Sequence, residues 1–210
     1  MLIIGLTGSI AMGKSTAGDY LAAQGVPLFN ADDMVHELYR NEAVAPVGAA
    51  FPGVIEEGVV DRARLSELLL ENPEKMALLE RIVHPLVIEK RLAFTEHHRL
   101  RGAQRIVVDI PLLFEKHLQD SVDITLLMTA PADIQLARAM KRPGMTTQKF
   151  EFIRAHQMDD AKKRALADFV IDTSGSFEQT HRRLDKFLEK LHAWPGKTNK
   201  PAASHQLEGS

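Results

Sequence analysis

The segment that most constrains the fold of this chain is a glycine-rich run near its start. It reads Gly8-Ser9-Ile10-Ala11-Met12-Gly13-Lys14-Ser15-Thr16. This run fits the pattern G-x-x-x-x-G-K-[ST], in which a tight turn joins a strand to a helix. A short apolar strand, Leu2 to Leu6, precedes it, and residues with helical spacing follow it. The flanking sequence therefore predicts an α/β fold with a phosphate-binding loop, here called the P-loop.

The residue order in the P-loop suits a nucleoside triphosphate. Small residues at Gly8 and Gly13 let backbone N–H groups converge on phosphate oxygens. The helix that follows directs its positive end at the same anion. Lys14 is expected to reach the β- and γ-phosphates, and the Ser15 hydroxyl is expected to bind Mg²⁺. We therefore expect ATP and Mg²⁺ as cofactors, with residues 8–16 as the nucleotide cradle.

Four further apolar runs predict the rest of a sheet. They are Val26 to Phe29, Arg105 to Asp109, Val122 to Met128 and Phe169 to Ile171. Helical stretches separate them, which is typical of βαβ units with parallel strands. We expect the P-loop NTPase fold, a three-layer α/β/α arrangement with a five-stranded parallel sheet.

The helical stretches indicate how the chain is organised. Its 210 residues fit one kinase-sized domain, 1–194, with the core at 1–30, 103–130 and 165–194. Residues 31–102 are expected to form a helical substrate-binding insertion and residues 131–164 a helical lid. Residues 195–210 have little apolar surface to bury and are expected to form a disordered tail.

Several residues mark where helices begin and end. Asn72-Pro73 predicts a helix start, and His84-Pro85 predicts the end or a kink of that helix. In the lid, Arg142-Pro143-Gly144 predicts a turn, after which Thr146 or Thr147 caps a helix that runs to about Arg164. Ser176 and Gln179 form a capping box for the last helix.

Composition restricts the partners. The chain has no cysteine, which excludes disulfides, thiolate catalysis and cysteine metal sites, and suits a cytoplasmic location. Its net charge of −2 gives nucleic acid or an anionic membrane little attraction. The opening run Met1 to Leu6 is too short to span a membrane. We expect no nucleic-acid or membrane partner, and a monomer or weak homo-oligomer.

The P-loop alone leaves several classes of protein open. A GTPase needs a base-reading segment such as Asn-Lys-x-Asp, and the nearest match, Asn199-Lys200-Pro201, lies in the predicted tail. An acidic pair follows the second strand, and a basic segment follows the fourth, with eight Lys/Arg against four Asp/Glu from Asp133 to Arg164. This layout favours a kinase that holds two phosphate-bearing molecules. A nucleotide-dependent regulator remains the alternative from another class.

Further segments resemble one kinase family. They are Gly5-Leu-Thr-Gly8, Ala31-Asp32, His84-Pro85-Leu86, Asp109-Ile-Pro-Leu-Leu-Phe-Glu115, Arg138 with Arg142, Gln157, and Ala167-Asp168-Phe-Val-Ile-Asp172. In this order and spacing, over nearly the whole chain to about Leu191, they resemble the dephospho-CoA kinases. The resemblance implies transfer of the γ-phosphoryl group of MgATP to the 3′-hydroxyl of dephospho-CoA, the last step of coenzyme A biosynthesis. A kinase of another small acceptor, such as a nucleoside monophosphate, stays the alternative within enzymes.

The resemblance also implies catalytic roles. Asp32 aligns with the family's catalytic aspartate, and its place after the second strand suits a base at the sheet edge of the P-loop. Asp33 is the substitute for this role, and alternatively Asp32 or Asp33 only caps the next helix. Arg138 and Arg142 are four residues apart, so we expect one helix face that closes over ATP. The alternative is a solvated basic face.

Other residues receive binding roles from the same resemblance. The place of Asp109 at the end of an apolar strand independently predicts either support of Mg²⁺ through water or a cap for the turn at Pro111. Ser174 and Gly175 approach adenine through backbone atoms. The implied substrate contacts are Thr7, Asp32, Arg62, His84, Leu112 and Glu115, although His84 also suits a buried histidine at a helix end. The chain departs from the family pattern at Asn30, His36, Ala11 and His156, where aspartate, arginine, glycine and arginine are common.

Overall fold

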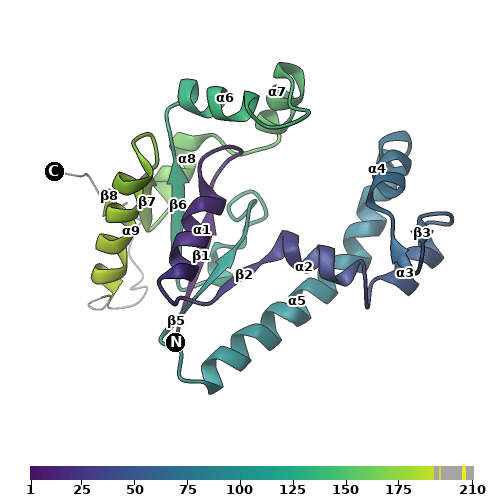
Figure 1. Cartoon of the computed structure of the whole chain (residues 1–210), viewed down its shortest axis with the longest axis horizontal. Helices are drawn as coiled ribbons and strands as arrows, with labels where there is room; N and C mark the ends of the chain where they lie inside the picture. The colour runs from purple at the N-terminus through teal and green to yellow at the C-terminus, as the bar shows by residue number, and fades with distance from the viewer. Residues whose placement is uncertain (192–193, 195–204, 207–210) are drawn as a thin grey trace. The chain divides into compact units, whose positions relative to one another are not determined.

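The computed structural model describes residues 1–191, 194 and 205–206 (Figure 1). Its contacts divide the chain into two compact units. The first, here the sheet unit, comprises Met1–Leu28 and Ala103–Ser210, and the second, here the helical unit, comprises Phe29–Gly102. The expected tail 195–210 lies outside the described residues apart from His205 and Gln206.

A central sheet has the strand order β2-β5-β1-β6-β7-β8. The strands are β1 (Leu2–Thr7), β2 (Leu28–Asn30), β5 (Arg105–Asp109), β6 (Ile124–Thr129), β7 (Phe169–Asp172) and β8 (His205–Gln206). β1 runs parallel to β5 and β6, with Ile4 opposite both Val107 and Ile124, and β6 runs parallel to β7. The predicted five-stranded parallel sheet is confirmed. The two-residue β8, which pairs with β7, was not predicted.

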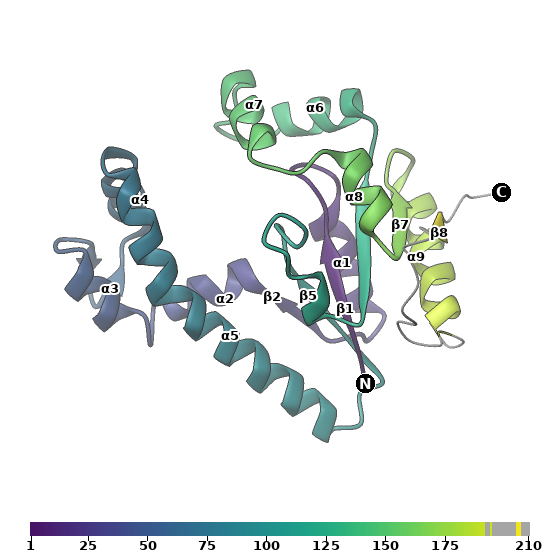
Figure 2. The same ribbon diagram turned by 180° about the vertical axis from the view of Figure 1, so that it is seen from behind.

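Helices cover both faces of this sheet (Figures 1 and 2). α1 (Lys14–Ala23) and α9 (Phe177–Leu191) lie on one face, where Ile4, Leu126 and Phe187 share a buried cluster. Tyr20 in α1 stacks on His181 in α9, with ring centroids 3.9 Å apart, and donates a 2.7 Å hydrogen bond to Asp185. On the opposite face, alternate strand residues pack against the loop after β5 and the end of α8: Ile3, Leu127 and Val170 with Leu113, Phe114, Val122 and Ala167. This confirms the three layers.

The segment 131–164 holds three helices: α6 (Ala132–Met140), α7 (Thr147–Ala155) and α8 (Asp160–Leu166). Thr146 caps α7, as one of the two predicted caps, by accepting from the Lys149 N–H. The prediction of a single helix to about Arg164 is wrong. The break falls where the Met158 N–H donates to Glu115, and Asp159 then caps a new helix at the Ala161 N–H. The predicted capping box at Ser176 and Gln179 is confirmed by reciprocal hydrogen bonds of 2.9 and 3.2 Å.

The helical unit is built around its own apolar cluster. Its elements are α2 (Ala31–Leu38), α3 (Val44–Ala50), β3 (Ile55–Glu56), β4 (Val59–Val60), α4 (Arg62–Glu71), η1 (Pro73–Lys75) and α5 (Met76–Leu100). Leu38, Phe51 and Leu65 are among the buried members of this cluster. The β3–β4 hairpin was not predicted. Its two-residue turn, Glu57-Gly58, takes positive φ at both positions, which is typical of tight hairpins.

The predicted end or kink of a helix at His84-Pro85 is not a helix end, because α5 continues through Pro85 to Leu100. Proline removes one N–H donor, which would pair with the carbonyl of Arg81. Arg81, His84 and Pro85 are all exposed, so water can hydrogen-bond to the freed carbonyl. The interpretation of His84 as a buried histidine is therefore wrong as well.

Across the described residues, α5 and the shorter helices all lack the length and apolar run that a membrane span needs.

Candidate active site

The P-loop joins β1 to α1 within the sheet unit. A side chain at Gly8 would clash, because its Cβ would lie 2.8 Å from the Met128 carbonyl oxygen of β6. Gly13 precedes α1 with a φ of 82°, and its absent side chain leaves the first N–H groups of α1 without a side-chain cap. Ala11 also lies in the left-handed region, at φ 61°, which glycine adopts more readily than alanine. The chain thus forms the predicted strand–turn–helix with a helix N-terminus that can receive an anion.

Lys14 and Asp109 form an ion pair beside this loop. The Lys14 ammonium group contacts both carboxylate oxygens of Asp109, which ends β5 next to β1. Asp109 is only 4% exposed, so its charge is held in a largely dry environment. The carboxylate therefore faces the P-loop lysine, which favours a role in the site over a role as the cap of the turn at Pro111.

A pocket of about 410 Å³ lies beside the P-loop. Arg138 and Arg142 both line it, together with Ala11, Gly13, Thr16, Thr173, Gly175, Ser176, Phe177 and Thr180. The Arg138 guanidinium group donates to Thr173 Oγ1 over 2.9 Å, whereas Arg142 is exposed. The expectation that both arginines project from one helix face is wrong. α6 ends at Met140, because Arg142 precedes a proline and stands in a turn.

Ser174 follows Thr173 at the same end of the sheet. Its N–H donates to Asp172 Oδ1 over 2.6 Å, so this backbone donor is engaged in a local turn. Gly175, in contrast, is exposed and lines the pocket. Of the two predicted adenine contacts, Gly175 lines the pocket beside the P-loop, and Ser174 is not among its lining residues.

The base of segment 131–164 contacts the P-loop through side chains that the sequence reasoning did not single out as site residues. Gln135 donates to the Ile10 carbonyl oxygen over 2.8 Å, and the Ile10 N–H donates to Gln157 over 3.0 Å. Lys163 donates to Ser9 Oγ over 2.9 Å and pairs with Glu115 over 2.8 Å. Gln157 was noted only as part of the resemblance. The signal for Lys163 was weak, because a lysine in a basic helix normally indicates a solvated face.

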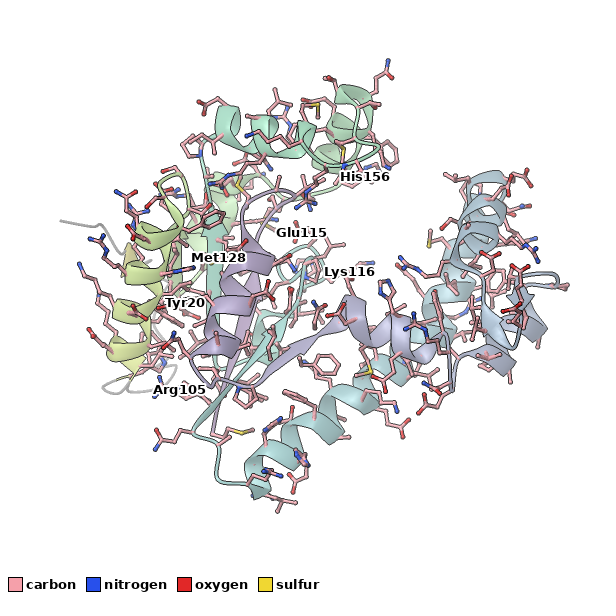
Figure 3. The ribbon with its side chains drawn as sticks, viewed as in Figure 1. Tyr20, Arg105, Glu115, Lys116, Met128 and His156 are labelled. Atoms are coloured by element: carbon pink, nitrogen blue, oxygen red, sulfur yellow. The ribbon has the colours of Figure 1, made fainter. Side chains whose placement is uncertain are left out.

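The predicted substrate contacts of the sheet unit differ in exposure. Thr7 is fully buried, and its hydroxyl donates to the Pro111 carbonyl oxygen over 3.3 Å. Leu112 is half-buried in the loop after β5. Glu115, in the same loop, is labelled in Figure 3 beside its exposed neighbour Lys116, and is engaged by Lys163. In this structure, Leu112 is therefore partly accessible, while Thr7 and Glu115 make internal contacts.

The helical unit has a pocket of its own, also of about 410 Å³. It is lined by Asp32, Val35, His36, Tyr39, Arg62, Leu65, Ser66, Leu69 and Leu79. The structure thus brings together Asp32 and Arg62, two predicted substrate contacts, with His36. Burial raises the pKa of the Tyr39 hydroxyl, and the nearby Arg62 charge opposes that rise.

The cap of α2 is Asn30. Its side-chain oxygen accepts from the N–H groups of Asp32, at 2.9 Å, and Asp33, at 3.3 Å. The interpretation of Asp32 or Asp33 as the cap is therefore wrong, because Asn30 already occupies that position. Asp32 is exposed in the first turn of α2, and its carboxylate is not needed to cap the helix.

The residues present fit a magnesium ion of the kind that nucleotides carry. Within the described part of the chain, groups of three or more His, Asp or Glu side chains that could hold a metal alone are not found. Mg²⁺ usually keeps several waters and takes one or two protein oxygens together with phosphate oxygens. Ser15, exposed in the first turn of α1, and Asp109, at the end of β5, offer such oxygens.

Comparison with known proteins gives the same assignment. A profile of the dephospho-CoA kinase family matches residues 2–179. The chain belongs to the dephospho-CoA kinase family. A dephospho-CoA kinase of Rhizobium meliloti is 50% identical over 193 residues, which cover 92% of this chain and 100% of that protein. The family is one of ATP-dependent kinases, so the chain is a transferase of coenzyme A biosynthesis. These matches do not favour the alternatives raised from the sequence, a nucleotide-dependent regulator or a kinase of another small acceptor.

Solved structures share the fold of this family member. A protein from Thermus thermophilus is 34% identical with a TM-score of 0.76, over 90% of this chain and 97% of that one. Dephospho-CoA kinase from Campylobacter jejuni, at 23% identity, has a TM-score of 0.66 over 90% and 96% of the two chains. The second likeness supports the fold alone.

Proposed function

We propose that the chain transfers the γ-phosphoryl group of ATP to the 3′-hydroxyl of the ribose of dephospho-CoA. The products are coenzyme A and ADP. The pocket of the helical unit supports dephospho-CoA as the acceptor. Its lining contains the Asp32 carboxylate together with the cationic or ionisable side chains Arg62 and His36. An acceptor with a ribose hydroxyl and a diphosphate needs that combination of a base and phosphate-binding groups.

ATP is held by the sheet unit in this proposal. The backbone N–H groups of residues 8–16 and the ammonium group of Lys14 bind the triphosphate. Arg138 and Arg142 neutralise the charge that develops on the transferring group, and both already border the pocket beside the P-loop. Gly175, with Ser174, approaches the adenine. Ser15, with support from Asp109, would hold Mg²⁺, which would supply positive charge against the β- and γ-phosphates.

Asp32 is the proposed base. Its carboxylate orients the 3′-hydroxyl and accepts its proton while the hydroxyl oxygen forms a bond to the γ-phosphorus. The bond between that phosphorus and the bridging oxygen breaks, and ADP leaves with the electron pair. The exposure of Asp32 and the capping of α2 by Asn30 support this role, because the carboxylate is available.

The remaining contacts concern acceptor binding. Arg62 binds the phosphates of dephospho-CoA, and its helix is fixed by Asp61, which caps α4. His84 and Leu112 supply further contact surface. Thr7 and Glu115 act indirectly by holding the loop after β5, since their side chains make internal hydrogen bonds and ion pairs there.

The substitution Asp32→Asn tests the proposed chemistry, with Asp33→Asn as its matched control on the same exposed turn. Loss of an acid–base group should lower turnover by about 10²- to 10⁴-fold while MgATP still binds. Asp33→Asn should retain turnover. If the Asp32 variant keeps both ATP hydrolysis and transfer, Asp32 is not the base, and hydrolysis that no acceptor stimulates would favour a regulator.

A further inference from the structure

A fully buried lysine, Lys163 in α8, contacts the P-loop at Ser9. Its side chain has no exposed surface. The ammonium group donates to Ser9 Oγ over 2.9 Å and pairs with Glu115 Oε1 over 2.8 Å. Because removing an ammonium group from water is costly, a lysine is rarely buried unless it is paired. The burial of this charge directly against a P-loop residue therefore needs an explanation beyond ordinary surface packing.

Glu115, the carboxylate partner of Lys163, accepts few hydrogen bonds besides this ion pair. Glu115 Oε1 also accepts from the Met158 N–H over 2.9 Å. Glu115 Oε2 is buried and accepts no hydrogen bond from the described residues. The pair therefore joins three segments, namely the P-loop, the loop after β5 and the start of α8.

The same part of the P-loop is held by two glutamines. Gln135 binds the carbonyl oxygen of Ile10, and Gln157 binds its N–H. Ser9 and Ile10 are thus fixed by side chains from α6, from the link between α7 and α8, and from α8 itself. Backbone groups that cradle phosphate work only if they are held in one geometry before the nucleotide arrives.

We propose that Lys163 is a positioning residue for phosphoryl transfer. It holds Ser9 Oγ against Glu115 and so fixes the start of the P-loop in the geometry that the triphosphate requires. This role rests on the proposed function of the P-loop as the ATP site. Lys163 contacts no substrate and acts through Ser9, in contrast to Lys14.

The test needs variants that separate positioning from folding. Lys163→Met alone leaves Glu115 buried without its cation, so this variant is expected to melt at a lower temperature. The double variant Lys163→Met/Glu115→Gln removes both charges and keeps an oxygen to accept from the Met158 N–H. Lys162→Met, which changes an exposed neighbour on the same helix, is the matched control.

The decisive measurement is a cycle with Ser9→Ala, made in the native chain and in the double variant. The affinity for MgATP is measured without any acceptor, and the melting temperature is recorded for each protein. We expect the double variant to fold, to bind MgATP about tenfold more weakly and to lose a similar or larger factor in turnover, as outer supporting groups do. Ser9→Ala should weaken binding in the native chain and have no further effect in the double variant.

Two results would overturn this role: MgATP affinity in the double variant equal to that of the native chain, or a Ser9→Ala effect of equal size in both backgrounds. A purely structural pair gives the second result. Because nucleotide affinity is measured without an acceptor, the outcome is independent of whether dephospho-CoA is the acceptor, and the two proposals can fail separately.

Discussion

The ammonium group of Lys14 lies against the carboxylate of Asp109, so the P-loop lysine is paired with the last residue of the adjacent strand β5. Phosphate oxygens and this carboxylate compete for the same cation. In the proposed function, Asp109 also supports the magnesium ion that Ser15 holds. The effect of Asp109 on ATP binding and turnover should therefore depend on whether Mg²⁺ is present.

Asp109→Asn should therefore have opposite effects with and without Mg²⁺. Without the metal, ATP should bind about tenfold more tightly, because Lys14 no longer has a competing carboxylate. With the metal, turnover should fall about 10- to 100-fold, as is usual for groups that support metal binding. Calorimetry with ATP and EDTA measures the first effect, and steady-state kinetics the second. Unchanged turnover with Mg²⁺ would remove Asp109 from the site.

Arg142→Ala should lower turnover by about 10³-fold, the scale of arginines that stabilise a transferring phosphoryl group. Its exposed side chain predicts an unchanged melting temperature. Arg138→Ala should lower both turnover and melting temperature, because Arg138 also anchors Thr173. Lys141→Ala, on the exposed turn between them, is the control. Turnover equal to that of the native chain for Arg142→Ala would instead indicate a solvated face.

Arg62→Ala should raise the KM for dephospho-CoA about 10- to 100-fold, the value of a lost hydrogen bond to a charged group. The KM for ATP should stay the same, since Arg62 lines only the pocket of the helical unit among the described pockets. Arg64→Ala controls for general charge effects, because it removes an exposed arginine of the same helix, one that pairs with Glu56 in β3. An equal rise in both KM values would argue against an acceptor contact.

Ala11→Gly should leave the melting temperature close to the native value, because two effects on folding stability nearly cancel. Glycine relieves the left-handed strain at φ 61°, about 1–2 kcal/mol. The lost methyl group, about 0.8 kcal/mol, packs against Ala139 and Phe150, and glycine also gains unfolded-state entropy. Ala11→Val should weaken MgATP binding about tenfold or more, since β-branched residues resist positive φ. Equal affinity for the valine variant would show that this geometry is not needed.

The sequence predicted the elements whose signals are local. The P-loop, the five parallel strands and the capping box at Ser176 each depend on residues close together in the chain. The Glu57-Gly58 turn was also a local signal and was missed, because the flanking strands have only two residues each. Helix α5 passes Pro85 where Arg81, His84 and Pro85 are exposed, so water can reach the freed carbonyl, and sequence alone does not reveal this exposure.

The side-chain contacts that fix Ser9 and Ile10 of the P-loop could not be predicted from local sequence signals. Lys163 reads as one of several charges on a basic helix, and only the fold reveals that it is buried against Ser9 and Glu115. The division between α7 and α8 arises from long-range contacts of Gln157 and Met158 with Ile10 and Glu115. Such contacts join residues more than 40 positions apart, and no local pattern encodes them.

The most direct test of the acceptor is ADP release from MgATP, measured with dephospho-CoA, adenosine and a panel of nucleoside monophosphates, with the product identified by mass. We expect turnover with dephospho-CoA to exceed that with every other acceptor by about 10⁴-fold or more, the discrimination that polar recognition can reach, with coenzyme A as the product. Faster turnover with any other acceptor would contradict the assignment of dephospho-CoA.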